Sequence, residues 1–147
     1  MFKYLVFCFF TMLLVCCKIS DGTGVIDAVQ YDSADSTVLS LKEGQAHILP
    51  TSGVRIAVKR VLEDSRCPKG VHCIWAGVGL VEIELTAEDG ETSLDTLSTS
   101  QVAKMGYSRS TVFANHRIKL ETLNPYPVSE KPSLNPVTYI VLISVLK

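Results

Sequence analysis

Cys67 and Cys73 lie six positions apart, and no other cysteine follows residue 17. His72 adjoins the second cysteine, while His47 and His116 belong to other segments. The C-x4-H-C arrangement lacks the repeated close pairs typical of zinc sites and the C-x-x-C spacing of thiol redox proteins. We therefore predict a disulfide between Cys67 and Cys73, no metal site and no cofactor.

Trp75 is the only tryptophan of the chain and follows the second cysteine by two positions. In other β-sandwiches a tryptophan packs on a disulfide inside the core. We expect the same of Trp75; the alternative is an exposed aromatic anchor for a partner or a sugar. The residues in and beside the ring that could contact a partner are Arg66, Lys69, Gly70, Val71, His72 and Trp75.

Arg66 adjoins the ring, and Asp64 lies two positions before it, on the same side of an extended chain. A carboxylate can accept two parallel hydrogen bonds from a guanidinium group, and such a pair can fix a turn. We expect Arg66 to be held by Asp64 or by a nearby backbone carbonyl, so that it supports the loop. Recognition would then belong to the tip, residues 69–72.

Short runs of alternating apolar and polar residues fill most of the chain after residue 36, separated by glycine, proline and Asp-Gly turns. Such runs predict half-buried β-strands. Seven or eight short strands indicate an all-β fold, an antiparallel β-sandwich, with a small β-barrel as the alternative. The expected strands are 37–41, 45–49, 54–59, 81–86, 92–96, 111–113, 117–121 and 139–146.

Four details refine this pattern. Residues 42–44, Lys-Glu-Gly, predict a hairpin between the first two strands. The alternation slips at 60–62, which predicts a bulge or a strand end. Residues 100–105 could form one helical turn, and residues 139–146 are apolar on both faces, which indicates a central or doubly covered strand.

The N-terminus has the pattern of an export signal. Lys3 precedes a dozen mostly apolar residues, 4–15, a run too short to cross a bilayer as a helix of about 20 residues. The run ends in a cysteine pair that resembles a lipobox, so we predict a lipoprotein-type leader over 1–16 and acylation of Cys17. Ordinary cleavage near Ser20 is the alternative. Acylation of Cys17 would anchor the protein to a membrane of the bacterial cell envelope, facing the periplasm or the cell exterior.

After the leader, a polar stretch over 17–36 predicts a flexible tether, within which residues 25–31 are an additional strand candidate. Residues 37–147 are then expected to form a single β domain. The whole chain has 14 Lys and Arg against 15 Asp and Glu, a formal charge of −1. This balance provides no basic stripe, so it argues against nucleic acid as a partner.

The central motif also carries a family resemblance. Residues 63–68, Glu-Asp-Ser-Arg-Cys-Pro, are followed after four residues by 73–77, Cys-Ile-Trp-Ala-Gly. This pattern resembles a family of small uncharacterised bacterial envelope lipoproteins with a D-S-R-C-P-x4-C-x-W-x-G loop. The resemblance implies an exported lipoprotein with a β domain, and it implies no particular activity.

Two function classes remain open from the sequence. The favoured one is a non-catalytic binding or accessory module that presents the stapled loop to an envelope protein. The alternative is a metal- or redox-active envelope protein, or an enzyme, that uses Cys67, His72 and Cys73. Native thiols that are blocked favour the first class, and thiols that are free or masked by metal favour the second.

The mature N-terminus should be lipid-modified Cys17, because the apolar run of the leader ends at the cysteine pair. Mass spectrometry of the protein extracted from membranes measures this directly. An unmodified, soluble N-terminus near Ser20 would show that the leader is cut as an ordinary signal peptide.

Overall fold

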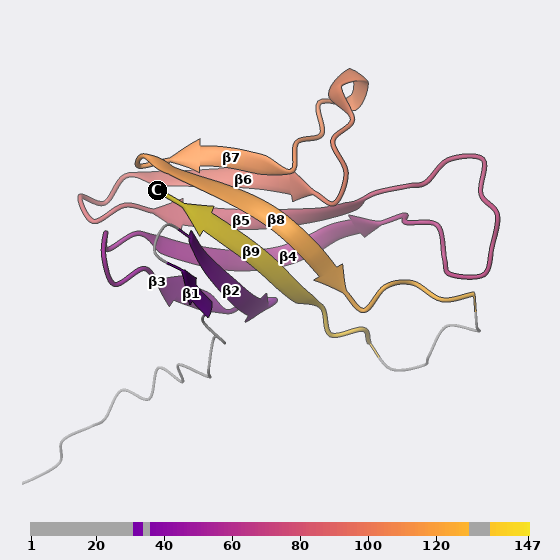
Figure 1. Ribbon diagram of the computed structural model, residues 1–147, viewed down its shortest axis with the longest axis horizontal. Helices are drawn as coiled ribbons and strands as arrows, with labels where there is room; N and C mark the ends of the chain where they lie inside the picture. The colour runs from indigo at the N-terminus through magenta and orange to yellow at the C-terminus, as the bar shows by residue number, and fades with distance from the viewer. Residues whose placement is uncertain (1–30, 34–35, 130–135) are drawn as a thin grey trace, which may run out of the picture.

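The computed structural model describes residues 31–33, 36–129 and 136–147 (Figure 1). The leader, residues 17–30 of the expected tether and most of the strand candidate 25–31 lie outside these residues. No helix in the described ranges is long and apolar enough to cross a membrane. The elements are β1 (Tyr31–Ser33), β2 (Ser36–Lys42), β3 (Ala46–Ile48), β4 (Arg55–Asp64), β5 (Gly79–Thr86), β6 (Thr92–Ser98), a 3-10 helix η1 (Ala103–Met105), β7 (Ser110–Phe113), β8 (His116–Asn124) and β9 (Ile140–Leu146).

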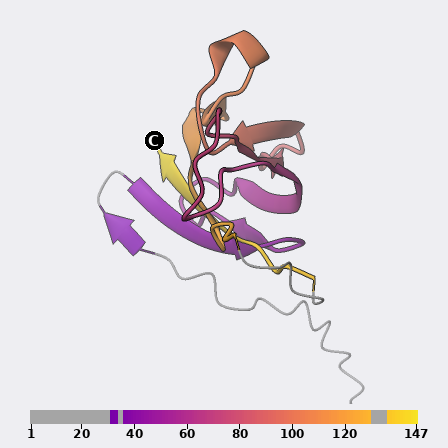
Figure 2. The same cartoon turned by 90° about the vertical axis from the view of Figure 1, so that its right-hand side faces the viewer.

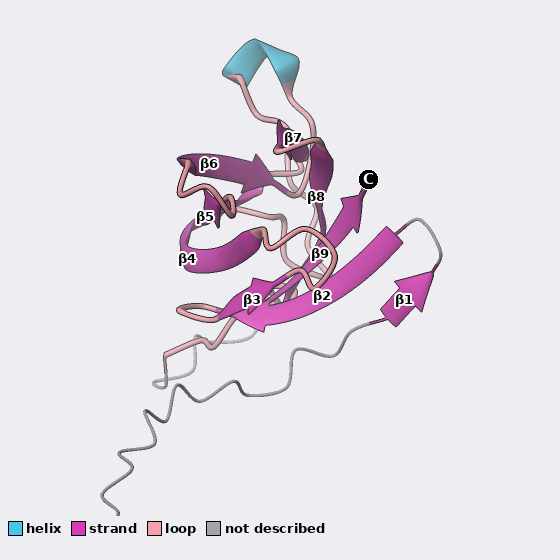
Figure 3. Ribbon diagram, turned by 90° about the vertical axis from the view of Figure 1, so that its left-hand side faces the viewer, coloured by secondary structure: helices cyan, strands magenta, loops and turns pink. Residues whose placement is uncertain are grey.

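The strands form two antiparallel sheets packed face to face. One sheet has the order β1-β2-β9-β8-β7, and the other has the order β3-β4-β5-β6. Figure 3 shows the two sheets from one end of the molecule, with η1 projecting beyond them. The sheets are open and do not close into a barrel, so the predicted β-sandwich is confirmed.

One continuous core fills the space between the sheets. Its members come from the apolar positions of the alternating strands, including Ile56, Val58, Ile83, Ile118 and Ile143, which are all fully buried. Ile56 pairs with Leu85 and Val58 pairs with Ile83 across β4 and β5, so these side chains point to the same face. The register predicted from alternation is therefore correct for this pair of strands.

The outer face of β4 and β5 carries charges of both signs. Glu84 accepts hydrogen bonds from Arg55 and Lys59, both at 3.2 Å, and Arg60 contacts Glu82 at 3.1 Å. The hydrogen bond and the charge of Lys59 lower the pKa of Glu84. Exposed pairs of this kind contribute little to stability, so they mark the solvent face more than they hold the sheet.

The predicted hairpin between the first two strands is wrong. β2 pairs with β9 in one sheet, and β3 pairs with β4 in the other, so the chain changes sheets at residues 43–45. The amide of Gly44 donates to the carbonyl of Val58, and the amide of Val58 donates to the carbonyl of Gln45. The same residue types form the turn of a hairpin and the turn at which a chain crosses from one sheet to the other. Here the backbone of β4 hydrogen-bonds to the turn, so the chain crosses between the sheets, and we call this turn a corner.

The expected bulge is confirmed. The pairing of β4 with β5 shifts register between Val58 and Arg60 and again between Val61 and Glu63. The Glu43 carboxylate accepts a 2.6 Å hydrogen bond from the amide of Val61, which lies between the two shifts. The bulges twist the end of β4, from which the cysteine loop leaves.

Three further expectations are resolved by the described residues. β9 is central, between β2 and β8, but its outer face is only partly covered, with Ile140 and Leu146 exposed, because none of the described elements forms a third layer outside this sheet. Within the expected tether, residues 31–33 form β1 and pair with β2, whose first residue is Ser36. The expected helical turn is present as η1.

Ile83→Ala should lower the free energy of unfolding by about 2 to 5 kcal/mol, because the fully buried side chain leaves a cavity between the sheets. The matched control is Glu84→Ala, on the next residue and the opposite face, which should leave the denaturant midpoint nearly unchanged. Chemical unfolding of both variants measures this, and equal losses would contradict the register.

Candidate functional site

The cysteine loop, residues 65–78, extends the β4–β5 hairpin past the end of the sandwich (Figure 1), and Figure 2 looks onto this end. The amide of Ser65 donates to the carbonyl of Val78 at 2.8 Å, and the amide of Cys67 donates to the carbonyl of Ala76 at 2.8 Å. Gly77 has φ of +68°, and a Cβ there would collide with the carbonyl oxygen of Ser65. Glycine is therefore required for the two arms of the loop to approach each other.

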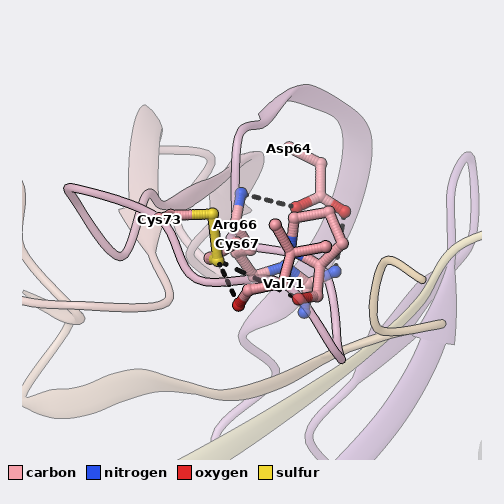
Figure 4. Close-up of a disulfide and its surroundings, with 6 residues drawn as sticks. Asp64, Arg66, Cys67, Val71 and Cys73 are labelled. Atoms are coloured by element: carbon pink, nitrogen blue, oxygen red, sulfur yellow. Dashed lines mark hydrogen bonds and ion pairs between the residues drawn. A yellow bond between two sulfur atoms is a disulfide. The ribbon is translucent and has the colours of Figure 1, made fainter. Parts of the chain in front are cut away.

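Cys67 and Cys73 form the predicted disulfide, with their Cα atoms 6.0 Å apart (Figure 4). The bridge closes a ring of seven residues within the loop. Inside the ring, the amide of Val71 donates to the carbonyl of Pro68 at 3.3 Å. Because the two sulfur atoms are bonded to each other, neither is a thiolate ligand or a nucleophile in this state.

A buried ion pair lies at the base of the ring. Arg66 donates from Nε to Asp64 Oδ1 at 2.6 Å and from Nη2 to Asp64 Oδ2 at 2.7 Å. The two side chains are only 7% and 9% exposed. This bidentate pair confirms the expectation that Arg66 supports the loop, and it removes Arg66 from the residues that could contact a partner.

The same pair ties the loop to the other sheet. Arg66 Nη1 donates to the carbonyl of Leu123 at 2.6 Å, and Nη2 donates to the carbonyl of Pro125 at 2.9 Å. The Tyr139 hydroxyl donates to Asp64 Oδ2 at 3.2 Å. Burial, and then the Asp64 carboxylate, raise the pKa of Tyr139, so its hydroxyl keeps its proton. The end of β8 and the segment before β9 are thus joined to the loop.

A second loop supports one side of the ring. The amide of Lys69 donates to the carbonyl of Pro127 at 3.0 Å, and Lys69 forms a parallel bridge with Val128. The ring of Tyr126 lies 4.8 Å from the Arg66 guanidinium carbon and 5.7 Å from Lys69 Nζ. Both cations therefore lie within the range of cation–π contacts with the Tyr126 ring.

The tip of the loop presents apolar side chains to solvent. Ile74 is fully exposed, and Trp75 and Val71 are 47% and 45% exposed. The expectation that Trp75 packs in the core is wrong. Trp75 lies between Cys73 and Ala76, on the tip side of the hydrogen bond from the Cys67 amide to the Ala76 carbonyl. This position is beyond the end of the sandwich, where no described strand of the opposite sheet covers it.

The structure thus separates the predicted contact residues into two groups. Arg66 is internal, while Lys69, Gly70, Val71, His72 and Trp75 are all exposed at the tip. Sequence reasoning missed Ile74, although its place between Cys73 and Trp75, outside any strand alternation, was a usable signal. It also missed Tyr126, which is flanked by two prolines.

The histidines do not converge. His47 lies in β3, His72 lies at the tip, and His116 begins β8, where its Nδ1 is 2.7 Å from the carbonyl oxygen of Ala114. Within the described ranges no three His, Cys, Asp or Glu side chains are placed to hold a metal ion.

Three loops meet at this end of the sandwich: 65–78, 99–109 and 125–129. We call it the loop end. A cleft of about 280 Å³ lies between them, and its walls include Arg66, Gly77, Thr99, Asn124 and Tyr126. The Arg66 guanidinium group in the wall of the cleft is already bound to Asp64 and to two backbone carbonyls, so it is not available to bind a ligand there.

Arg66→Ala should lower the free energy of unfolding by about 3 to 5 kcal/mol, because it leaves the Asp64 carboxylate buried without its cation. The matched control is Arg60→Ala, whose pair with Glu82 is exposed and should change stability by no more than about 1 kcal/mol. The double variant Asp64→Leu/Arg66→Met should lose less than Arg66→Ala. An unchanged melting temperature for Arg66→Ala would show that the pair does not hold the loop.

Replacing both Cys67 and Cys73 with Ala should lower the free energy of unfolding by about 2 kcal/mol, the entropy of closing a seven-residue ring. Denaturant unfolding under oxidising and reducing conditions measures this. The variant should not respond to reductant, while the parent protein should. An identical midpoint for the two proteins would mean that the bridge does not act as a staple.

No protein-family model, curated protein or solved structure matches this chain. The resemblance to envelope lipoproteins therefore stays a prediction that rests on the loop motif and the leader. What the structure establishes is an all-β sandwich with a disulfide-closed loop at one end.

Proposed function

We propose that this protein is an exported, lipid-anchored cell-envelope module that binds without catalysis, through the tip of its disulfide-closed loop. The contact residues are Lys69, Val71, His72, Ile74 and Trp75. The N-terminal lipid on Cys17 would hold the domain at a membrane, and the loop would make the specific contact.

The observation that carries this proposal is the contrast between the base and the tip of the loop. At the base, Asp64 and Arg66 are buried and fully engaged with each other and with backbone carbonyls. At the tip, Ile74 and Trp75 face solvent. Exposed apolar side chains on a pre-ordered loop contribute nothing to the fold, and the order of the loop lowers the entropic cost of a contact.

The alternative, a metal or redox activity of Cys67, His72 and Cys73, has less support. The two sulfurs are bonded to each other, and His72 is exposed without a second imidazole or a carboxylate among its described neighbours that would complete a metal site. The cysteine spacing also differs from that of thiol oxidoreductases.

The test places a benzophenone amino acid at position 74 in the full chain and irradiates intact cells. Position 112 is the matched control, because Val112 is equally apolar, 63% exposed and located in β7 at the opposite end of the sandwich. We expect an adduct with protein or with lipid from position 74 and none from position 112. Absence of an adduct at 74, or equal labelling at both positions, would contradict contact through the tip.

A further inference from the structure

We propose that the loop end docks on the surface of an anionic phospholipid bilayer, with Val71, Ile74 and Trp75 entering the interfacial layer. This inference rests on the proposed function, since it names what the tip contacts. It follows from three properties of the loop end: its exposed apolar side chains, its charge and its reach.

The loops beside the cysteine loop carry further exposed apolar side chains. Tyr126, Val128 and Met105 are also exposed, at 40%, 57% and 53%, and they belong to the two loops beside the cysteine loop. Tryptophan and tyrosine favour the boundary between lipid and water, because their rings are apolar with one polar atom. Side chains on separate protruding loops enter a soft lipid layer more readily than they match one rigid protein surface.

Charge distinguishes the two ends of the molecule. The loops 65–78, 99–109 and 125–129 contain no Asp or Glu. Besides the buried Arg66 they carry Lys69, Lys104 and Arg109, of which Arg109 is paired with Glu121 of β8 at 4.0 Å. Glu43, at the corner between β2 and β3, is engaged by the amide of Val61. At the opposite end, the turn between β5 and β6 contains Glu88, Asp89 and Glu91. Figure 1 shows this turn and the cysteine loop at opposite ends of the long axis.

This asymmetry complements an anionic surface. Lysine near a membrane that contains acidic lipids gains free energy from the negative surface potential, whereas a carboxylate is repelled. An orientation with the loop end toward the membrane therefore brings apolar and cationic side chains to the bilayer together.

The reach of the N-terminal segment permits this orientation. Between Cys17 and Tyr31 the chain has fourteen peptide steps, which span at most about 50 Å. The ten residues of β4 extend about 33 Å, so the sandwich is shorter than this reach. An extended segment therefore lets the loop end turn toward the membrane that holds the proposed lipid anchor.

Trp75 is the only tryptophan of the chain, so its fluorescence reports this contact without labelling. The full chain, purified from membranes, is reconstituted in vesicles of phosphatidylcholine and phosphatidylglycerol, with and without brominated acyl chains. We expect the brominated lipid to quench Trp75. The matched control, Trp75→Phe/Val112→Trp, moves the tryptophan to β7 at the opposite end and should not be quenched.

Two further variants test the chemistry of the contact. Ile74→Ser should lower the ratio of quenched to unquenched Trp75 roughly tenfold, because one aliphatic side chain leaves the lipid. Lys69→Gln should lower that ratio about fivefold in vesicles with phosphatidylglycerol and have little effect in phosphatidylcholine alone. Both positions are exposed, so melting temperatures should be unchanged and serve as the folding check.

Quenching of Trp75 alone supports the inference. Equal quenching at positions 75 and 112 would overturn it, because the whole domain would then lie on the lipid without a specific end. No quenching at Trp75, together with a protein adduct from the crosslinker at position 74, would overturn the bilayer contact and leave the proposed function intact. No quenching and no adduct would contradict both.

Discussion

The ion pair of Asp64 and Arg66 is the interaction on which the loop end depends. It removes two charges from water, and this cost is offset only because the guanidinium group also satisfies two backbone carbonyls and the carboxylate accepts a tyrosine hydroxyl. Those partners lie near the end of β8 and before β9. One buried cation therefore joins the root of the cysteine loop to strands of the opposite sheet.

The loop divides into a part that is ordered by this network and a part that is left to solvent. Backbone hydrogen bonds, Gly77 and the disulfide restrict the ring, so the tip cannot collapse onto the sandwich to bury Ile74 and Trp75. The loop 99–109 also combines apolar and cationic side chains, and the loop 125–129 adds apolar ones, while the turn between β5 and β6 at the far end is acidic. The two ends of the long axis thus differ in charge, and the packing of the core does not require this difference.

Interactions between residues close in the chain could be predicted from the sequence. Alternation identified most strands and the apolar face of β4 and β5, since a period of two is a property of the extended chain itself. The slip near residue 61 identified the bulge for the same reason. The disulfide followed from Cys67 and Cys73 being the only cysteines after residue 17, and the pairing of Asp64 with Arg66 followed from a spacing of two residues in an extended chain.

Sheet membership and burial were decided only by the tertiary structure. The turn after β2 has the residues of a hairpin, yet β2 pairs with β9 and β3 pairs with β4, in different sheets. Trp75 is a residue type common in cores, but the loop places it beyond the end of the strands, where none of the described strands covers it. The carbonyls of Leu123 and Pro125 that complete the Arg66 site are more than fifty residues away, and backbone atoms leave no signal in sequence. Local periodicity therefore determines the strands, whereas the choice among available edges and layers belongs to the whole chain.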